Sequence, residues 1–404
     1  MSSKHNRREF LKYSSLASAS LFIPQFLKAN NTMLFGDKGK PKVLVVIQLS
    51  GGNDGLNCVV PFRNDIYYKS RPDIGLKKEE LILLDDETGL NNNLAGLADL
   101  FLNGDAVIIN NVGYPNPNRS HFRSMDIWQT GSDEDVYWQT GWLGKVLDSS
   151  CNNKDCVPPH YALEIDDTMS LALKGNTMSG FAVRDPKNFR FAQQNPLMSD
   201  IAKSVHVTDE HHNVAYLHKT LSDITESADY IYETSAKYNS TALYPQDEFG
   251  KQLKTIAELI IAEADTRIYY VSLSGFDTHA LQKDQQNKKL KQYADALKIF
   301  CTDLKANKKF DDTLVMTFSE FGRRVEQNGS RGTDHGTANN IYLVGGGMKR
   351  GGMMNALPDL SKLDDGDLIY SIDFRDVYAT ILDKWLKADA NFVLEKDFEM
   401  LDFL

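Results

Sequence analysis

Six acidic or histidine side chains lie just after three apolar runs of the chain, and all six are of types that bind metal ions. The apolar runs, residues 43–49, 267–274 and 313–318, are rich in β-branched and aromatic residues and predict buried strands. In open α/β sheets, ligands bind beyond the carboxyl ends of the strands, so we expect these side chains to face one shared pocket. The six residues are Asp54, Asp277, His279, Glu320, Asp334 and His335.

Carboxylate and imidazole groups gathered in this way indicate a site for divalent cations. Carboxylate with imidazole suits zinc, manganese or iron, whereas carboxylate alone suits magnesium or calcium. We therefore expect one or two ions of zinc, manganese, magnesium or calcium. In the alternative interpretation, Asp54 and Asp334 cap turns and the histidines only form hydrogen bonds. Glu320 then pairs with Arg323 or Arg324, but the six residues together favour the metal site.

A helix predicted over residues 119–128 begins close to the hydroxyl of Ser120. A helix N-terminus collects unpaired N–H groups and the positive end of the helix dipole, so this hydroxyl would lie in an anion site. Serine is also a common N-cap residue, and that purely structural role is an equally good interpretation.

Helices and further strands separate the three apolar runs. A helix is expected at 92–103 and a strand at 106–113, and this spacing predicts a β-α-β unit in which the strand pairs in parallel with the first run. Helices at 246–265 and 281–306 precede the second and third runs. The alternation predicts an α/β fold.

The size of the chain bounds its domain organisation. At 404 residues and 42% hydrophobic composition, the chain can bury a large core. We expect a signal segment at residues 1–29, a linker at 30–42 and one domain at 43–404. A less regular insertion is expected within that domain at about 145–240.

The first 29 residues resemble a twin-arginine export signal. Arg7 and Arg8 are adjacent and precede a weakly apolar, Ser/Ala-rich run that is too short to span a bilayer. We expect the twin-arginine translocase to export the folded chain to the periplasm or the medium; an amphipathic first helix is the alternative. In that oxidising compartment, Cys151 and Cys156 form either a disulfide or two free thiols.

Charge and hydropathy exclude two classes of partner. The formal net charge is −10, and an acidic surface repels phosphate backbones, so we expect no nucleic-acid partner. No stretch is long and apolar enough to cross a membrane, so we expect no stable membrane insertion.

Several motifs resemble one bacterial family, named domain of unknown function 1501. The motifs are GGNDGLN, RSHF, SGFDTHA, SEFGRR and TDHGTAN, and the likeness runs from about residue 42 to the C-terminus. That family is grouped with the alkaline-phosphatase-like fold, which also holds sulfatases. The resemblance implies an α/β three-layer sandwich with a mainly parallel central sheet and helices on both faces.

The resemblance also implies roles for individual residues. In the relatives, an Asp after the first strand and later Asp/His pairs bind two metals, and a Ser, Thr or Cys that opens a helix is the nucleophile. Carried over by position, Asp54 is then the first-strand ligand and Ser120 the nucleophile. Asp277 and His279 match the pair on the middle strand.

The late strand departs from the pattern of the relatives. Where they carry Ser-Asp-His-Gly, this chain has Ser319, Glu320, Phe321 and Gly322. Glu320 can replace the Asp, but Phe321 cannot bind a metal, and His335 would stand in for the final histidine. The sulfatase nucleophile motif Cys-x-Pro-x-Arg is absent, which disfavours a formylglycine sulfatase.

These features predict an exported, metal-dependent hydrolase of phosphate esters and, less readily, of sulfate esters. We expect Ser120 or a metal-bound water to attack, with His121 as base or metal ligand. The anion would be held by Arg323 or, as alternatives, by Arg119, Arg324 or Arg331. The alternatives are that His121 is a packed helix residue and Arg323 a salt-bridge partner. The expected substrate is an anionic ester of a small molecule, a glycan or a lipid.

The competing prediction is a noncatalytic periplasmic binding or assembly protein that keeps the fold and at most one metal. Phe321 favours this prediction, whereas Asp54, Ser120 and His335 favour the hydrolase. A nucleotide-binding oxidoreductase is disfavoured, because GGNDG lacks the glycine spacing of a dinucleotide-binding fingerprint.

Overall fold

The computed structural model describes residues 41–151, 156–186, 212–349 and 351–404. Lys42–Leu404 form one compact unit. The signal expected at 1–29 and nearly all of the linker expected at 30–42 lie outside the described residues. Among the helices that are described, none combines the length and the apolar character needed to cross a bilayer.

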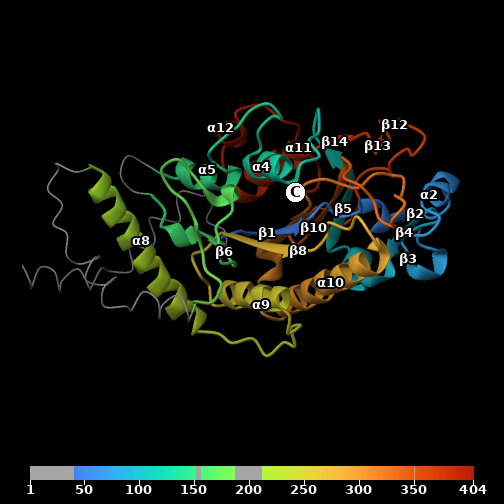
Figure 1. Cartoon of the computed structure of the whole chain (residues 1–404). Helices are drawn as coiled ribbons and strands as arrows, with labels where there is room; N and C mark the ends of the chain where they lie inside the picture. Colours follow the sequence, from blue (N-terminus) through green and yellow to red (C-terminus); the bar gives the residue numbers. More distant parts are fainter. Residues whose placement is uncertain (1–40, 152–155, 187–211, 350) are drawn as a thin grey trace, which may run out of the picture. The chain divides into compact units, whose positions relative to one another are not determined.

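A nine-stranded sheet lies at the centre of the described part of this unit (Figure 1). Its strands are β1 (Val43–Ser50), β5 (Ala106–Gly113), β6 (Ala162–Glu164), β7 (Phe181–Ala182), β8 (Ile268–Ser274), β9 (Thr313–Phe318), β10 (Asn339–Val344), β11 (Gly352–Met353) and β14 (Ile372–Asp373). Their order is β11, β5, β10, β9, β1, β8, β6 and β7, and β14 pairs with β5. β1 is parallel to both β8 and β9, so the three apolar runs of the sequence are adjacent strands.

The strand predicted at 106–113 matches β5, but the expected pairing with β1 is wrong. β10 and β9 lie between β5 and β1, and β10 is antiparallel to β5 and to β9. β5 and β1 therefore run in the same direction without contact. Local spacing could not reveal this arrangement, because the strand that separates them comes from much later in the chain.

Helices cover both faces of the sheet, which confirms the predicted α/β architecture. The helices are α2 (Asp65–Ser70), α3 (Ala95–Leu102), α4 (His121–Thr130), α5 (Trp142–Ser149), α8 (His212–Ser235), α9 (Glu248–Ile261), α10 (Gln282–Ala306), α11 (Phe374–Thr380) and α12 (Ala390–Leu394). α9 and α10 lie on one face, and α4, α5 and α11 lie on the other (Figure 1). β1 is buried along almost its whole length, as expected for a strand covered on both sides.

Smaller elements surround the main sheet. Residues 145–240, where an insertion was expected, include β6, the edge strand β7 and the helix α8. A disulfide joins Cys151 and Cys156. The remaining strands form a three-stranded sheet and a hairpin: β2 (Val59–Pro61), β3 (Leu81–Leu83) and β4 (Thr88–Asn91), and β12 (Leu363–Asp364) with β13 (Asp367–Leu368).

Aromatic stacking fixes α4 against the sheet. Trp128 of α4 stacks on Phe318 at the end of β9, with ring centroids 5.1 Å apart, and on Phe374 of α11 at 4.4 Å. All three rings are buried. Stacked and buried aromatic rings supply much of the packing energy at such a junction. The contacts hold the first residue of α4, His121, near the carboxyl end of β9.

We expect His160 to make the protein less stable in acid. Its ring is buried and stacks on Tyr230 of α8, and burial lowers its pKa to about 4. In the unfolded chain, the imidazole of His160 takes up a proton near pH 6.5. The contribution of the neutral, buried ring to the free energy of unfolding is therefore complete above that pH and is lost as the pH falls toward 4. The loss is at most about 3 kcal/mol.

Urea unfolding of the wild type and His160→Gln between pH 4 and pH 7 checks this expectation. The variant should show a smaller fall in unfolding free energy across this range. Equal slopes in the two proteins would contradict the burial argument.

Candidate metal centre

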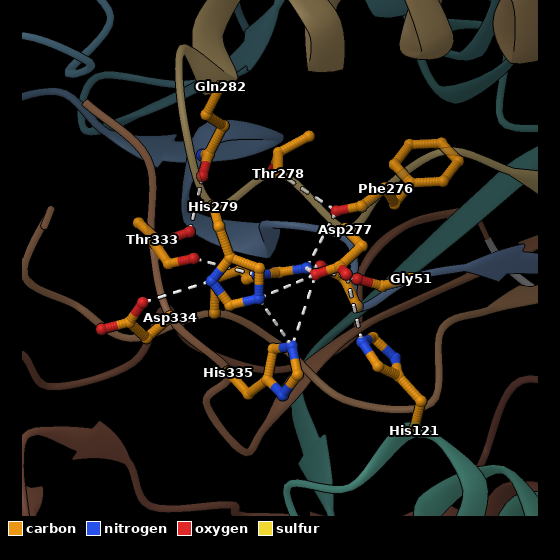
Figure 2. A network of polar contacts seen from close by, with 12 residues as sticks. Gly51, His121, Phe276, Asp277, Thr278, His279, Gln282, Thr333, Asp334 and His335 are labelled. Carbon is orange, nitrogen blue, oxygen red and sulfur yellow. Dashed lines mark hydrogen bonds and ion pairs between the residues drawn. The ribbon is translucent and has the colours of Figure 1, made fainter. Parts of the chain in front are cut away.

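Three segments bring polar side chains together at the carboxyl end of the sheet (Figure 2). Asp277 and His279 follow β8, Glu320 follows β9, and His335 lies in the loop between β9 and β10. His121 is the first residue of α4. Because β8 and β9 flank β1 in parallel, the loops after all three strands meet at one edge.

Three imidazole rings direct their Nε2 atoms at the Asp277 carboxylate (Figure 2). The Nε2 atoms of His279 and His335 lie 3.0 Å and 3.3 Å from Oδ1, and that of His121 lies 3.6 Å from Oδ2. The Nε2 atoms of His279 and His335 are 3.0 Å apart. Ligand atoms of His121, Asp277 and His335 all lie within 4.8 Å of one another. We call these four residues the histidine cluster.

The Nδ1 atom of each imidazole in the cluster forms a hydrogen bond with an oxygen atom. The pairs are His121 with Glu320 at 2.9 Å, His279 with Asp334 at 3.2 Å, and His335 with the carbonyl oxygen of Arg119 at 2.8 Å. A carbonyl oxygen and an ionised carboxylate can only accept, so the Nδ1 atoms carry the protons. The Nε2 lone pairs therefore face the carboxylate, which is the tautomer that metal-binding histidines commonly adopt.

The cluster residues fit a divalent cation. The Nε2 atom of His121 is buried and has no hydrogen-bond partner in the described part of the chain. A buried polar atom without a partner in the protein often marks the place of a ligand or ion. The inward-facing lone pairs and the carboxylate would also repel one another without a positive charge between them. Imidazole nitrogens with one carboxylate suit zinc, manganese or iron better than magnesium or calcium.

Neighbouring charges set the protonation of the cluster. Burial would raise the pKa of Asp277, but the hydrogen bond and charge of Arg323 bring it below its ordinary value, so the carboxylate is ionised at neutral pH. The hydrogen bond with Glu320 raises the pKa of His121, whereas burial lowers the pKa of His335. Protons therefore compete with a cation for His121 before they compete for His335 as the pH falls.

Glu320 and Asp334 were expected to bind metal directly, but the structure places them behind the histidines. Glu320 is fully buried, and its Oε1 atom accepts from the backbone N–H of Gly51 at 2.8 Å as well as contacting His121. Asp334 contacts His279 in the same way. These oxygens are taken by N–H groups, so both carboxylates orient imidazoles.

Gly51 allows the loops after β1 and β8 to touch. It has φ 121°, and a Cβ atom there would lie 2.4 Å from the backbone nitrogen of Asp277. Only glycine adopts this conformation without strain and leaves room for the neighbouring loop. The first glycine of GGNDG is therefore required by a close approach of two strand ends.

Asp54 contacts Arg71 and Gln282 rather than any residue of the cluster. Its Oδ2 atom accepts from Arg71 Nη1 at 2.6 Å and from the amide of Gln282. Both Asp54 and Arg71 are buried. The structure thus places Asp54, which was expected to bind the metal, outside the cluster and beside a buried guanidinium.

Arg323 was expected to hold a substrate anion, but it is buried and bonded throughout. Nε donates to the carbonyl oxygen of Gly52 at 2.6 Å, Nη1 to that of Thr333 at 2.9 Å, and Nη2 to Asp277 Oδ1 at 2.7 Å. All three nitrogens donate to protein oxygens. Arg323 joins the strand-end loops and balances the charge of Asp277.

Ser120 occupies the N-cap position of α4 but makes no side-chain capping hydrogen bond. The residue is exposed, and its backbone N–H donates to Asn118 Oδ1 at 2.8 Å. Its chain neighbours both take part in the centre, since His121 belongs to the cluster and Arg119 contacts His335 through its carbonyl oxygen. Ser120 is therefore adjacent in the chain to two residues of the centre, and its hydroxyl is not engaged in capping the helix.

Sequence reasoning missed the parts played by Arg119 and Arg71. Arg119 acts on the cluster through a backbone carbonyl, and residue types carry no signal for such a contact. Arg71 lies in a different segment from Asp54 and belongs to no motif that marks it as a partner. A buried carboxylate usually needs a basic partner, so a search for such a partner of Asp54 was the available signal for Arg71.

Comparison with known proteins finds one family and several similar structures. The family described as "Protein of unknown function (DUF1501)" matches residues 105–394. No curated protein matches the chain.

Solved structures similar to the chain include three with identities of 10–12%. The PsFucS1 sulfatase from Pseudoalteromonas sp. has a TM-score of 0.40 at 11% identity, and the match covers 99% of this chain and 75% of that one. A protein in the alkaline phosphatase superfamily from Vibrio parahaemolyticus has a TM-score of 0.39 at 12% identity, with coverages of 90% and 71%. The phosphonate monoester hydrolase SpPMH from Silicibacter pomeroyi has a TM-score of 0.34 at 10% identity, with coverages of 89% and 78%.

Substitution within the cluster is expected to remove bound metal. After loading with zinc or manganese, elemental analysis should find metal in the wild type and little in Asp277→Asn or His335→Ala, because each change deletes a donor. Glu320→Gln should keep the site but bind about 10- to 100-fold more weakly, since it loses an orienting charge. His160→Gln is the matched control for an unrelated histidine. Full metal content in Asp277→Asn would show that the cluster is not the site.

Loss of Arg71 is expected to destabilise the fold. Arg71→Met leaves the buried Asp54 carboxylate without a partner, and breaking such a pair costs about 3–5 kcal/mol. Denaturant unfolding of the metal-free proteins measures the loss. The double variant Arg71→Met/Asp54→Leu should recover a large part of it, because it removes the unpaired charge. A single variant as stable as the wild type would contradict the assigned ion pair.

Proposed function

We propose that this chain, which belongs to the DUF1501 family, is a metal-dependent hydrolase of phosphate esters and, less readily, of sulfate esters. The observation that carries the proposal is the histidine cluster. Three Nε2 atoms converge on one carboxylate, and each imidazole is fixed at its Nδ1 by an oxygen acceptor. Fixing three tautomers in this way is the arrangement that a metal site requires.

We assign His121, Asp277 and His335 as the residues that hold the cation. Their ligand atoms form one group within 4.8 Å. Three protein ligands leave a coordination position open, as catalytic sites do and closed structural sites do not. When bound, the cation would supply Lewis-acid chemistry, withdrawing charge from the oxygens of the phosphoryl or sulfuryl group.

We assign His279 to proton transfer. Its side chain is 45% exposed, compared with 28% for His121 and 23% for His335, so it lies at the open side of the cluster. Asp334 holds its Nδ1 atom, which leaves Nε2 free to accept a proton. An imidazole oriented by a carboxylate is a common general base and general acid.

Ser120 is the proposed nucleophile, with a water molecule as the alternative. Its hydroxyl is exposed and makes no capping bond, and it stands at the N-terminus of α4, a helix of 10 residues. The unpaired N–H groups and dipole of that terminus favour an anionic group next to the hydroxyl. In this assignment the hydroxyl proton passes to Nε2 of His279 as the serine oxygen bonds to phosphorus and the bond from phosphorus to the ester oxygen breaks. The imidazole then returns the proton to the departing alcohol, and water hydrolyses the phosphoserine.

Export through the twin-arginine route is part of the proposal. The paired arginines at residues 7 and 8 carry the signal, and the periplasm or the medium is the destination. The Cys151–Cys156 disulfide supports this localisation, because disulfides persist mainly in oxidising compartments. The route also carries folded proteins, so metal could be loaded before export.

Hydrolysis of aryl phosphates, phosphodiesters and sulfates by the metal-loaded protein tests the function. Loss of the proton-transfer group in His279→Ala should lower the rate constant of the chemical step by about 10²- to 10⁴-fold while metal stays bound. Ser120→Ala should lower it comparably if serine attacks and only slightly if water attacks. Ser149→Ala, which removes a hydroxyl on α5, is the matched control.

Bound metal without turnover of any of these esters would favour the competing function, a noncatalytic binding or assembly protein. One observation supports that alternative: the guanidinium next to the cluster, Arg323, is consumed by protein contacts. Loss of metal together with activity in His279→Ala would instead make His279 a fourth ligand and overturn its assignment to proton transfer.

A further inference from the structure

A cavity of about 350 Å³ lies directly behind the histidine cluster. Its wall includes Tyr114, Trp128, Phe321, Ile369 and Tyr370. Trp128 and Phe321 are each only 2% exposed, whereas Ile369 is 50% exposed, so the cavity is apolar inside and reaches solvent beside Ile369. Its volume is in the range of pockets that hold small ligands.

The cavity and the cluster share a wall. The ring of Phe321 lies 4.8 Å from the ring of His121 and 4.7 Å from that of His335, and it also lines the cavity. Arg119 lines the cavity too, and its carbonyl oxygen holds His335. Ser120 is the next residue along the chain. Three consecutive residues thus connect the cavity, the proposed nucleophile and the cluster.

Three polar side chains of the cavity wall are already bonded within the protein. The hydroxyl of Thr337 donates to the carbonyl oxygen of Leu368 at 2.5 Å, and the amide of Asn116 donates to Glu134 at 2.6 Å. The hydroxyl of Tyr114 pairs with Ser124 at 3.0 Å. A sugar or polyol would bury hydroxyl groups here without enough partners, which costs binding energy.

One polar group of the wall does lack a partner. The indole N–H of Trp128 is buried and forms no hydrogen bond with the described residues. Buried donors without a partner are uncommon in native proteins, and such a donor often bonds a ligand or a water molecule. The wall therefore offers mainly aromatic surface, with one buried donor that has no partner among the described residues.

We infer that this cavity binds the organic group of the ester, and that this group is an aryl or compact alkyl group rather than a sugar. The inference rests on the proposed function, because it places the anionic end of the same substrate at the cluster. The guanidinium of Arg119 pairs with Asp367 and Asp365, so protein carboxylates already balance its charge, and the anionic end is placed at the proposed cation instead. An aromatic ring can stack on the apolar walls.

Binding of phosphonates, which cannot be hydrolysed, tests the inference without relying on turnover. Isothermal titration of the metal-loaded protein should find benzylphosphonate binding about 10- to 100-fold more tightly than methylphosphonate, because the added ring becomes buried. Ile369→Asn should lower this ratio several-fold. Leu102→Asn, a change at an exposed leucine on α3 that does not line the cavity, is the matched control and should keep the ratio.

A spectroscopic measurement locates the ring. In protein labelled with ¹⁵N-tryptophan, benzylphosphonate should shift one indole resonance, and that resonance should be absent in Trp128→Phe. Methylphosphonate should leave it in place. Equal affinities for the two phosphonates, or an unmoved Trp128 resonance, would overturn the inference even if esters are hydrolysed. A clear preference for the benzyl compound without turnover of any ester would support the cavity assignment and count against the hydrolase.

Discussion

The buried guanidinium of Arg323 is the interaction on which the rest of the site depends. It donates to carbonyl oxygens of Gly52 after β1, Phe276 after β8 and Thr333 before β10, and to the carboxylate of Asp277. One positive charge therefore joins three loops that are far apart in the chain. A planar group with five donors in a fixed geometry can do this, whereas the ammonium of a lysine cannot. The paired charge of Asp277 compensates for its burial.

With the loops joined, the remaining side chains divide into an inner and an outer set. Asp277 and three imidazoles form the inner set, and their Nε2 atoms face one another. Glu320, Asp334 and the carbonyl oxygen of Arg119 form the outer set, which fixes each ring at its Nδ1. The outer contacts decide the chemistry, because they make the inner nitrogens lone-pair donors. The carboxylates of Glu320 and Asp334 differ from that of Asp277 in that each accepts a hydrogen bond from an imidazole Nδ1 atom.

Phe321 separates a polar centre from an apolar cavity. The ring contacts His121 and His335 on one side and the cavity on the other, and it is almost fully buried. An apolar wall beside the cluster lowers the local polarisability and strengthens every charge interaction inside it. The residue that cannot bind a metal therefore has a physical role at the site, and this role supports a binding surface in its neighbourhood.

The sequence determined the strands β1, β8 and β9 and the polar groups at their ends, because hydrophobic periodicity and strand termination are local properties. It also brought Asp277, His279 and His335 into one predicted pocket, since adjacent parallel strands end at one edge. Only the tertiary structure decided that Asp54 pairs with Arg71, that Glu320 orients a histidine, and that β10 separates β5 from β1. These outcomes depend on contacts between buried groups and side chains or strands that are distant in the chain. Residue type and local spacing do not predict such long-range contacts.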